Sequence, residues 1–310
     1  MRAAAAAAHS ETMKTMTSLQ RLVELLRVER LEENLFRGVS ADMGSPAVFG
    51  GQVLGQALMA AATTVDPGRT VHSLHAYFLR PGDKQARIVY DVDRSRDGGS
   101  FTTRRVVAIQ HGQPIFNFAA SFHVAEPGPH HQAAMPKAAG PDGLANETEL
   151  RARLAARLPE PHATRVAGLD WPIEIRPLNP VDLLEPPECE PRNDAWLRAP
   201  GPLPDDPLLH QAMLAYASDF GLLRSSMMPH GLSFMQPNLQ VASLDHAMWF
   251  HAPFRMDDWL LYTTDSPWAG GARGFCRGSL WTREGQLVAS VAQEGLVRVR
   301  TKPRGPDAQP

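Results

Sequence analysis

The chain repeats part of its own pattern, and this internal repeat constrains the fold more than any other feature of the sequence. A constant shift of 172 residues aligns a stretch that begins at Ser73 with one that begins at Asp245. An ordered series of matches at one shift indicates two halves built on the same plan. The matched positions include Tyr77 with Trp249, Phe78 with Phe250, Pro81 with Pro253, Tyr90 with Tyr262, and Gly98-Gly99 with Gly270-Gly271.

Each half begins with an apolar helical segment, at 50–65 in the first half and at about 207–227 in the second. Strand-like runs separated by turn residues follow each helix. A helix followed by consecutive hairpin strands is typical of an α+β fold in which an antiparallel sheet wraps around one long helix. The expected strands are 71–79, 87–94, 100–111 and 114–124 in the first half, and 239–250, 259–266, 271–282 and 286–300 in the second.

These patterns divide the chain into two repeats, 19–125 and 171–300, joined by a linker over 126–170. The linker is rich in Pro, Ala, His and Gly, and one short helix is expected near 147–157. The opening segment 19–35 is amphipathic and predicts a helix that packs on the core. Outside the repeats we expect a disordered N-terminal extension over 1–18 and a polar tail over 301–310.

Composition argues against several functional classes. The formal charge is −2 and no segment combines dense Lys and Arg with aromatic residues, so nucleic-acid binding is not expected. No apolar run approaches the ~18–20 residues of a membrane-spanning helix, and the Ala-rich N-terminus lacks the apolar core of a signal peptide. Cys189 and Cys276 are far apart, and two free thiols fit a reducing compartment. We therefore expect a cytoplasmic protein.

The histidines do not predict a metal site. His72 and His75 are three residues apart on an expected strand, so they point to opposite faces and make a poor pair of ligands. His246 and His251 lie on a strand without a Cys or Asp cluster beside them. The sequence also lacks a G-x-S-x-G elbow and a phosphate-binding P-loop, which argues against a serine hydrolase or a nucleotide hydrolase.

Three polar residues of the second half fall on or beside faces that the pattern predicts to be apolar. Asp219 lies at the edge of the apolar stripe of the helix, whereas Ser218 is expected to point away from it. Gln293 shares its strand face with Leu287, Ala289 and Val291, and Ser243 follows Leu239 and Val241 on one face. A buried carboxylate or amide needs partners or a use. An ordinary interior hydrogen bond remains the alternative for each residue.

The repeat supplies a comparison for these three residues. The corresponding positions of the first half carry no carboxylate and no amide, so the polar trio occurs once. If the trio is a site, each chain therefore holds one site rather than two. The corresponding positions are Thr64 for Asp219, Val71 for Ser243, and Ala120 for Gln293.

At these residues the sequence resembles the acyl-CoA thioesterase II family, whose members are fused double hot-dog folds. The resemblance extends from about Leu19 to Val299 and implies two tandem hot-dog repeats that form one unit. It places the family's catalytic Asp, hydroxyl and Gln on Asp219, Ser243 and Gln293; many members have Thr where this chain has Ser243. The segments that carry the resemblance are FGGQVLGQAL, HSLHAYFLRPGD, SRDGGSFTTRRV, LAYASDF, LDHAMWFH and VASVAQEG.

The resemblance implies hydrolysis of fatty acyl-CoA to free fatty acid and CoA, without a metal or a dissociable cofactor. Asp219 would activate a water that Ser243 and Gln293 orient. Backbone amides near Gly50 and Gly51 are candidate donors to the oxyanion, with a helix cap or close packing as the alternative. The resemblance also suggests a homo-oligomer, namely a tetramer. Candidate contacts to the CoA phosphates are Arg80, Arg104 and Arg105, with solvated strand charges as the alternative.

Two other functions remain open from the sequence. The first is another hot-dog enzyme that acts on acyl-CoA, such as a hydratase or dehydratase. Such enzymes usually use an Asp–His pair, so His210 or His246 would have to approach Asp219. The second is an acyl-CoA binding module without catalysis. A binding module has no need of the three polar residues, and it would usually carry a partner domain.

Overall fold

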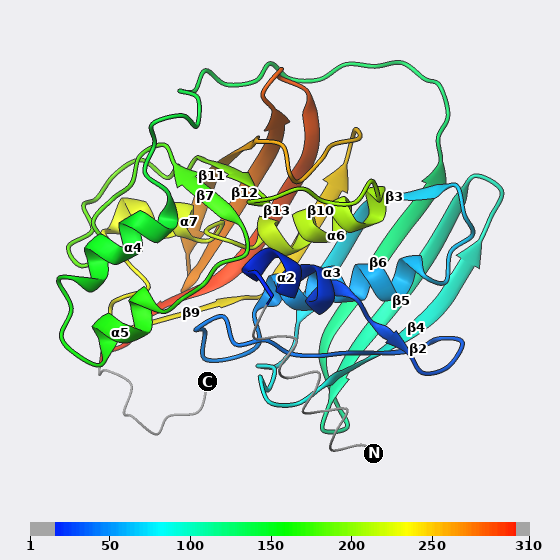
Figure 1. The fold of residues 1–310 in the computed structure, drawn as a ribbon, viewed down its shortest axis with the longest axis horizontal. Coiled ribbons are helices and arrows are strands. Elements are labelled where there is room, and N and C mark those ends of the chain that lie inside the picture. The colour runs from blue at the N-terminus through cyan, green and yellow to red at the C-terminus, as the bar shows by residue number, and fades with distance from the viewer. Residues whose placement is uncertain (1–15, 302–310) are drawn as a thin grey trace.

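A computed structural model describes residues 16–301 of the chain, so most of the expected N-terminal extension and almost all of the expected tail lie outside the described residues. The described chain forms one thirteen-stranded sheet with helices against it (Figure 1). The first half contains α2 (Ser18–Leu26), β1 (Glu29–Arg30), β2 (Leu35–Gly38), α3 (Gly50–Ala62), β3 (Arg69–Phe78), β4 (Ile88–Asp97), β5 (Phe101–Gln110) and β6 (Gln113–Val124).

The rest of the chain adds five further helical segments and seven strands to the described structure. The helical segments are α4 (Glu147–Ala155), α5 (His162–Ala167), α6 (Pro207–Ser218), α7 (Arg224–Met227) and a single 3-10 turn (Met228–His230). The strands are β7 (Glu174–Pro177), β8 (Ala195–Arg198), β9 (Leu239–Ser243), β10 (Asp245–Phe250), β11 (Leu260–Gly270), β12 (Arg273–Thr282) and β13 (Leu287–Val299).

The two halves join edge to edge through one antiparallel strand pair, β3 with β10. The sheet order is β1-β2-β4-β5-β6-β3-β10-β13-β12-β11-β8-β7, with β9 paired to β13. At the junction His75 lies opposite Ala247, and these are also the two residues that the 172-residue repeat aligns. The strand order on one side of the junction therefore mirrors the order on the other. This confirms the predicted architecture of two α+β repeats in one unit.

The long helices of the two repeats, α3 and α6, lie side by side across the same face of the sheet (Figure 1). Two glycines of α3 allow their backbones to approach closely. A Cβ at Gly51 would lie 2.2 Å from the carbonyl oxygen of Tyr216, and one at Gly55 would lie 3.0 Å from that of Ala212. Because the contacts run in opposite directions along the two helices, α3 and α6 are antiparallel, and the start of α3 meets the end of α6.

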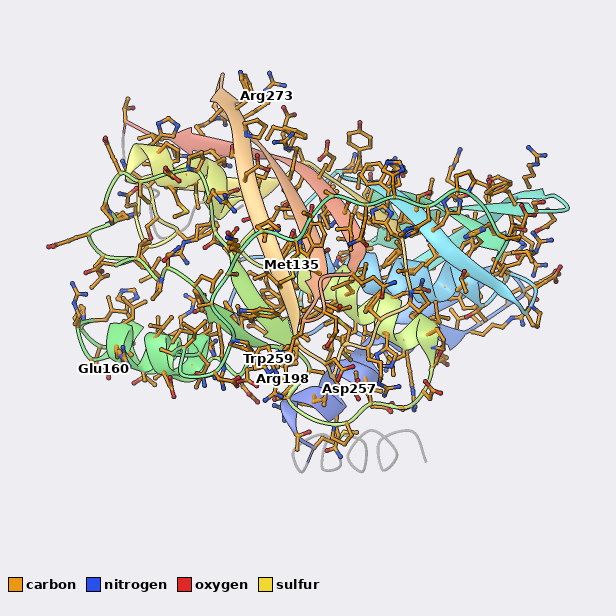
Figure 2. The ribbon with its side chains drawn as sticks, turned by 90° about the horizontal axis from the view of Figure 1, so that it is seen from above. Met135, Glu160, Arg198, Asp257, Trp259 and Arg273 are labelled. Atoms are coloured by element: carbon orange, nitrogen blue, oxygen red, sulfur yellow. The ribbon has the colours of Figure 1, made fainter. Side chains whose placement is uncertain are left out.

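The linker covers part of the outer face of the sheet in the second half. Trp196, Trp259 and Trp281 form an apolar cluster there, separate from the core between the sheet and the helices, and Met135 of the linker packs on it. The indole N–H of Trp196 donates to the carbonyl of Ala139, at 2.7 Å. Figure 2 labels Met135 and Trp259, together with Arg198, whose guanidinium lies 4.3 Å from the centre of the Trp259 ring.

Several predicted boundaries were wrong. The helix expected over 19–35 ends at Leu26, because the chain then extends to form β1 and β2. The helix expected over 207–227 ends at Ser218, and Gly221, at a φ of 69°, turns the chain before α7. The strand expected over 239–250 is broken at Leu244. The short strands β2, β7 and β8 and helix α5 were not predicted.

No helix among residues 16–301 is long and apolar enough to cross a bilayer. The same residues contain no cluster of three or more His, Cys, Asp or Glu side chains that a metal ion would occupy. Cys189 and Cys276 are both free thiols, and Cys276 is buried.

Candidate active site

The carboxylate of Asp219 lies where the two halves of the chain meet. Asp219 follows the last residue of α6 and occupies its C-cap position, while α3 of the other half begins at Gly50. The Oδ2 atom of Asp219 accepts a hydrogen bond from the backbone N–H of Gly51, at 3.0 Å. The first N–H groups of a helix have no partner within the helix, and the helix dipole there favours a negative charge. The second half of the chain thus supplies the carboxylate, and the first half supplies the helix N-terminus whose partial positive charge faces it.

The other carboxylate oxygen, Oδ1, faces β13. Gln293 lies on the buried face of this strand, is 1% exposed, and donates from Nε2 to Oδ1 of Asp219 at 2.8 Å. The carbonyl oxygen of the same amide, Oε1, is buried and has no hydrogen-bond partner among the described residues. The expected position of Gln293 on the inward face is therefore confirmed, and the amide orients its donor toward the carboxylate.

Ser243 is the third member of the trio. It ends β9, and its hydroxyl lies 3.4 Å from Oδ1 of Asp219. Hydroxyl hydrogen bonds are usually ~2.5–3.0 Å long, so this contact is weak. Leu244 separates β9 from β10, and both of these strands pair with β13. The structure thus brings Asp219, Ser243 and Gln293 together around one carboxylate oxygen, although they are distant in sequence.

Buried neutral groups surround the carboxylate. Burial lowers the pKa of His246 to about 4, although the nearby charge of Asp219 acts in the opposite direction. Burial and the charge of Asp219 both raise the pKa of Tyr216 and of Tyr262. At neutral pH these three side chains are therefore uncharged. The neighbours of the Asp219 carboxylate thus carry no charge of their own.

Ser218 was expected to point away from the buried face, and this was wrong. Helix α6 is enclosed by α3 and the sheet, so both sides of its last turn are buried and Ser218 is 0% exposed. The Ser218 hydroxyl lies 3.0 Å from the carbonyl of Ala215 and 2.9 Å from Nε2 of His246. The phenol of Tyr262 donates to the backbone carbonyl of Ser218 at 2.8 Å. These contacts fix the turn that carries Asp219.

Gly50 and Gly51 lie at the site, but Gly51 does more than the sequence predicted. The Gly51 N–H is already bonded to Asp219, so in this arrangement it is not free for an oxyanion. A Cβ at Gly50 would lie 2.8 Å from Oδ2 of Asp219 and 2.9 Å from the ring of Phe78. Close packing therefore requires glycine at both positions. The Gly50 N–H remains the candidate oxyanion donor, because it donates to no other described residue.

The three predicted phosphate-binding arginines have different surroundings. Arg104 is 1% exposed, donates to Thr64 and forms an ion pair with Asp97 at 2.6 Å, so its assignment to CoA was wrong. Arg105 is exposed on the face of the sheet opposite the helices. Arg80 is exposed just beyond β3, and its guanidinium donates to the carbonyl of Pro114 at 2.7 Å. Of the three arginines, Arg80 is the one that comes two residues after Phe78, whose ring packs against Gly50.

Arg104 also explains why the first half has no second site. The repeat aligns Thr64 with Asp219, and the guanidinium of Arg104 lies 2.8 Å from the hydroxyl of Thr64 and 2.9 Å from its carbonyl. Arg104 lies opposite Ala120 in the sheet, as Cys276 lies opposite Gln293. The volume that corresponds to the trio is therefore filled by an arginine side chain. This accounts for a single trio in each chain.

The hydratase alternative requires a histidine that bonds to Asp219. Among residues 16–301 no histidine does so. The ring of His246 contacts Ser218, and Nδ1 of His210 accepts from the backbone N–H of Met256 at 3.0 Å. The sequence analysis did not predict that His246 is buried beside the trio, although its place two residues before Met248 on an inward strand face is a usable signal. His246 is 0% exposed.

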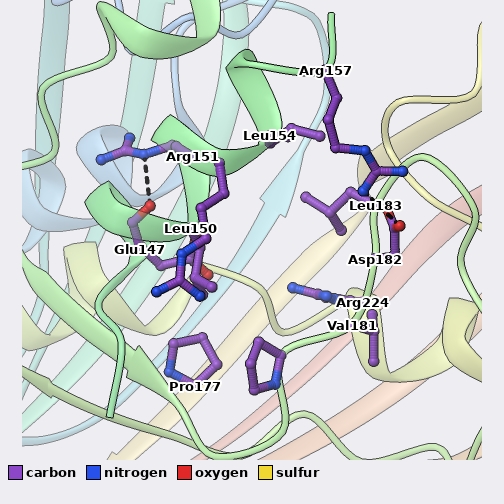
Figure 3. A pocket seen from close by; sticks show the side chains of 12 residues that line it. Glu147, Leu150, Arg151, Leu154, Arg157, Pro177, Val181, Asp182, Leu183 and Arg224 are labelled. Carbon is purple, nitrogen blue, oxygen red and sulfur yellow. Dashed lines mark hydrogen bonds and ion pairs between the residues drawn. The ribbon is translucent and has the colours of Figure 1, made fainter. Parts of the chain in front are cut away.

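Two cavities of the described structure are not lined by any of the three residues of the trio. The larger, about 1050 Å³, lies between α2 and the segments 39–43 and 168–172, and Tyr216 forms part of its wall. The smaller, about 310 Å³, lies beside α4 and contains Arg151, Arg157 and Arg224 (Figure 3). Figure 3 shows that Arg157 pairs with Asp182 there. Both cavities are therefore separate from the carboxylate.

Comparisons with known proteins show the family to which the chain belongs. The family model described as acyl-CoA thioesterase matches residues 163–296, and the model of the acyl-CoA thioesterase N-terminal domain matches residues 39–123. Human acyl-coenzyme A thioesterase 8 is 43% identical over 288 residues, which cover 89% of this chain and 88% of that protein. This chain belongs to the acyl-CoA thioesterase family.

Solved structures support the same family and fold. The acyl-CoA thioesterase II from Mycobacterium marinum has 43% sequence identity and a TM-score of 0.73, and the match covers 92% of this chain and 100% of that one. A hot-dog protein from Alicyclobacillus acidocaldarius, at 18% identity, has a TM-score of 0.70 over 91% of this chain and 99% of that one. The predicted double hot-dog fold of this acyl-CoA thioesterase family member is thus confirmed.

Proposed function

We propose that this protein hydrolyses fatty acyl-CoA thioesters to the free fatty acid and CoA, with Asp219 as the general base. The observation that carries this proposal is the convergence of three polar side chains from distant segments on one carboxylate oxygen. Gln293 donates to Oδ1 of Asp219 at 2.8 Å, and Ser243 lies 3.4 Å from the same atom. A carboxylate is a suitable acceptor for a proton from water, and the N-terminus of α3 favours negative charge at this position.

In the proposed reaction, a water oxygen attacks the thioester carbonyl carbon while Asp219 takes one proton from that water. The carbonyl π electrons move to oxygen and give a tetrahedral oxyanion. The oxyanion then collapses, the C–S bond breaks, and the proton on Asp219 passes to the sulfur of CoA. The products are the acid and the thiol, and the balance needs no metal, cofactor or further reactant. Positioned acid–base catalysis of this kind contributes roughly 10²–10⁴ in rate.

The neighbouring groups have distinct tasks in this scheme. Gln293 and Ser243 orient the water by hydrogen bonds, so that its lone pair faces the carbonyl carbon. The weak 3.4 Å contact between Ser243 and Asp219 leaves the hydroxyl able to exchange its partner for that water. The Gly50 N–H, at the positive end of α3, is the candidate donor to the oxyanion. Arg80 is the candidate contact to the CoA phosphates.

The setting of the enzyme is also a proposal. Free Cys189 and Cys276 suit a reducing compartment, which supports a cytoplasmic enzyme of fatty acid metabolism. A homo-oligomer, namely a tetramer, is supported by aromatic residues exposed on the outer face of the central strands. Tyr77 of β3 is 62% exposed and Trp249 of β10 is 37% exposed. Sedimentation of the purified full chain tests this, and a monomer at all concentrations contradicts it.

A substrate panel tests the proposed activity. The full chain is incubated with acyl-CoAs of increasing chain length, and released thiol is measured; enoyl-CoA hydration is assayed in parallel. Thiol release without hydration is expected, whereas binding without turnover favours a binding module. Single turnover in H₂¹⁸O then tests for a mixed anhydride with Asp219 that water cleaves at the Asp219 carboxyl carbon. Direct attack places ¹⁸O in the fatty acid, and ¹⁸O in the peptide that contains Asp219 contradicts the general-base role.

A further inference from the structure

Two buried polar atoms beside the trio have no hydrogen-bond partner among the described residues. They are Oε1 of Gln293 and Nδ1 of His246, on side chains that are 1% and 0% exposed. Buried polar groups are nearly always hydrogen-bonded, because an unmade bond costs about 1–3 kcal/mol. One of these atoms is an acceptor and the other is a possible donor. If they lie close together, they are therefore expected to share a hydrogen bond, directly or through a water.

The sheet register places these two residues side by side. Ala247 of β10 lies opposite Ala292 of β13, and the strands are antiparallel, so the preceding His246 faces the following Gln293. The backbone N–H of Leu244 donates to the carbonyl of Glu294, which keeps the strands together at this point. Directly opposite residues share one face of the sheet, with Cβ atoms about 4.5–5.5 Å apart. Both side chains therefore project into the same buried space beneath Asp219.

The contacts of Ser218 bear on which nitrogen of His246 carries the proton. The Ser218 hydroxyl lies 3.0 Å from the carbonyl of Ala215, which only accepts, and 2.9 Å from Nε2 of His246, which accepts or donates according to the tautomer of the ring. Burial keeps His246 neutral, so one ring nitrogen donates and the other accepts. If Ser218 donates to Nε2, the ring proton lies on Nδ1. That tautomer turns Nδ1 into a donor for the unpartnered Oε1 of Gln293.

We propose that His246 is a positioning residue that acts through Gln293. Its Nδ1–H donates to Oε1 of Gln293, after a small side-chain rotation or through one bridging water, and so fixes which end of the amide faces Asp219. The inference rests on the proposed function, because Gln293 must orient the water for its orientation to matter. The proposed chain of hydrogen bonds runs from Ser218, next to Asp219 in sequence, through His246 and Gln293 to the Asp219 carboxylate.

The chemical consequence concerns the direction of the Gln293 amide. With Oε1 held by His246, Nε2 faces Oδ1 of Asp219 and donates to it, as observed at 2.8 Å. A flipped amide would set Oε1 against the carboxylate, and two acceptors repel. Without the His246 donor, the amide populates both directions and the attacking water loses its fixed partner. Because this loss acts only through Gln293, it disappears when Gln293 is already absent.

A double-mutant cycle tests this dependence. The variant His246→Gln keeps an amide that reaches toward Ser218 but lacks a donor at the Nδ1 position, and Gln293→Met keeps the side-chain length without an amide. In the natural background His246→Gln is expected to lower kcat/KM about 3- to 10-fold, as for one lost hydrogen bond. In the Gln293→Met background it is expected to cause no further loss. His246→Asn, whose amide reaches the Nδ1 position, is expected to retain more activity than His246→Gln.

Several results would overturn the inference. Full activity of His246→Gln contradicts it, and so does an equal loss in both backgrounds, because an equal loss indicates a general packing effect. If His246→Gln fails to fold, as judged by thermal unfolding, Ser218→Ala replaces it, with the same non-additive result expected. Full activity of Gln293→Met places the failure in the proposed function of Gln293 itself. If Gln293→Met loses activity and the His246 variants cause the same further loss in that background, the proposed function stands but His246 has no part in it.

Discussion

The backbone N–H of Gly51 donates to Oδ2 of Asp219 at 3.0 Å, and this hydrogen bond joins the first half of the chain to the Asp219 carboxylate of the second half. The bond is possible because Gly51 lacks a Cβ where α3 touches the backbone of α6. A duplicated fold thus uses its two halves differently: one presents a helix N-terminus and the other presents an acid.

Gly51→Ala is expected to destabilise the protein. The new Cβ would lie 2.2 Å from the carbonyl oxygen of Tyr216, so α3 and α6 must separate. Overpacking of this kind costs about 1–3 kcal/mol in the free energy of unfolding. Gly99→Ala is the matched control, because a Cβ at Gly99 meets no atom within 4 Å. Chemical denaturation of both variants gives the comparison, and equal midpoints contradict the close approach of the helices.

Ser243→Ala is expected to lower kcat/KM by about 3- to 10-fold, since it removes one hydrogen bond to the attacking water. Ser243→Thr keeps the hydroxyl and is expected to remain close to the natural enzyme in rate. Both variants should unfold at nearly the same temperature as the natural protein, because Ser243 is only half-buried. Equal activity of the Ala and Thr variants would show that the hydroxyl is not used.

Arg104 and Arg80 are expected to respond in opposite ways. Arg104→Gln removes a buried guanidinium that holds Thr64 and Asp97, and should lower the free energy of unfolding by about 1–3 kcal/mol without changing KM. Arg80→Gln changes an exposed side chain and should raise KM for acyl-CoA with little effect on stability. Steady-state kinetics and thermal unfolding of both variants decide this. A raised KM for a stable Arg104→Gln would restore its role in CoA binding.

The stability of the protein is expected to fall as pH drops from about 6.5 toward 4. Burial lowers the pKa of His246 to about 4, whereas an unfolded histidine titrates near 6.5. In this window the unfolded chain binds more protons, so the contribution of His246 is fully present above pH 6.5 and is lost as pH falls. The loss amounts to about 3 kcal/mol at most. Melting curves of His246→Gln should show a shallower acid dependence, and an identical dependence contradicts the buried neutral ring.

The fold was predictable from the sequence because the patterns that indicate it are periodic. The repeat and the alternation of apolar residues depend on strand and helix geometry, and these survive in any packed structure. Helix ends were less predictable. The apolar pattern continues beyond Ser218 into Leu222 and Leu223, so the turn at Gly221 was hidden within what reads as one helix.

The site was predictable only in part, for a physical reason. Asp219, Ser243 and Gln293 stood out as polar groups on apolar faces, and the family resemblance linked them. Contacts between segments that are distant in sequence leave no such signal, so the bond between Gly51 and Asp219 and the contact between His246 and Ser218 appeared only in the structure. The assignment of Arg104 to CoA was wrong because an arginine on a strand usually faces water, whereas Arg104 is buried opposite the small Ala120 of the neighbouring strand.

The central claim is that Asp219 activates water, and Asp219→Asn tests it most directly. The amide keeps the shape of the carboxylate and still offers Gly51 an acceptor, but it cannot take a proton. Released CoA thiol is measured for the natural protein, for Asp219→Asn and for Asp142→Asn, a surface carboxylate that is 85% exposed. The account predicts at least a ~100-fold loss of kcat/KM for Asp219→Asn alone, with unfolding temperatures unchanged. Full activity of a folded Asp219→Asn would contradict the account.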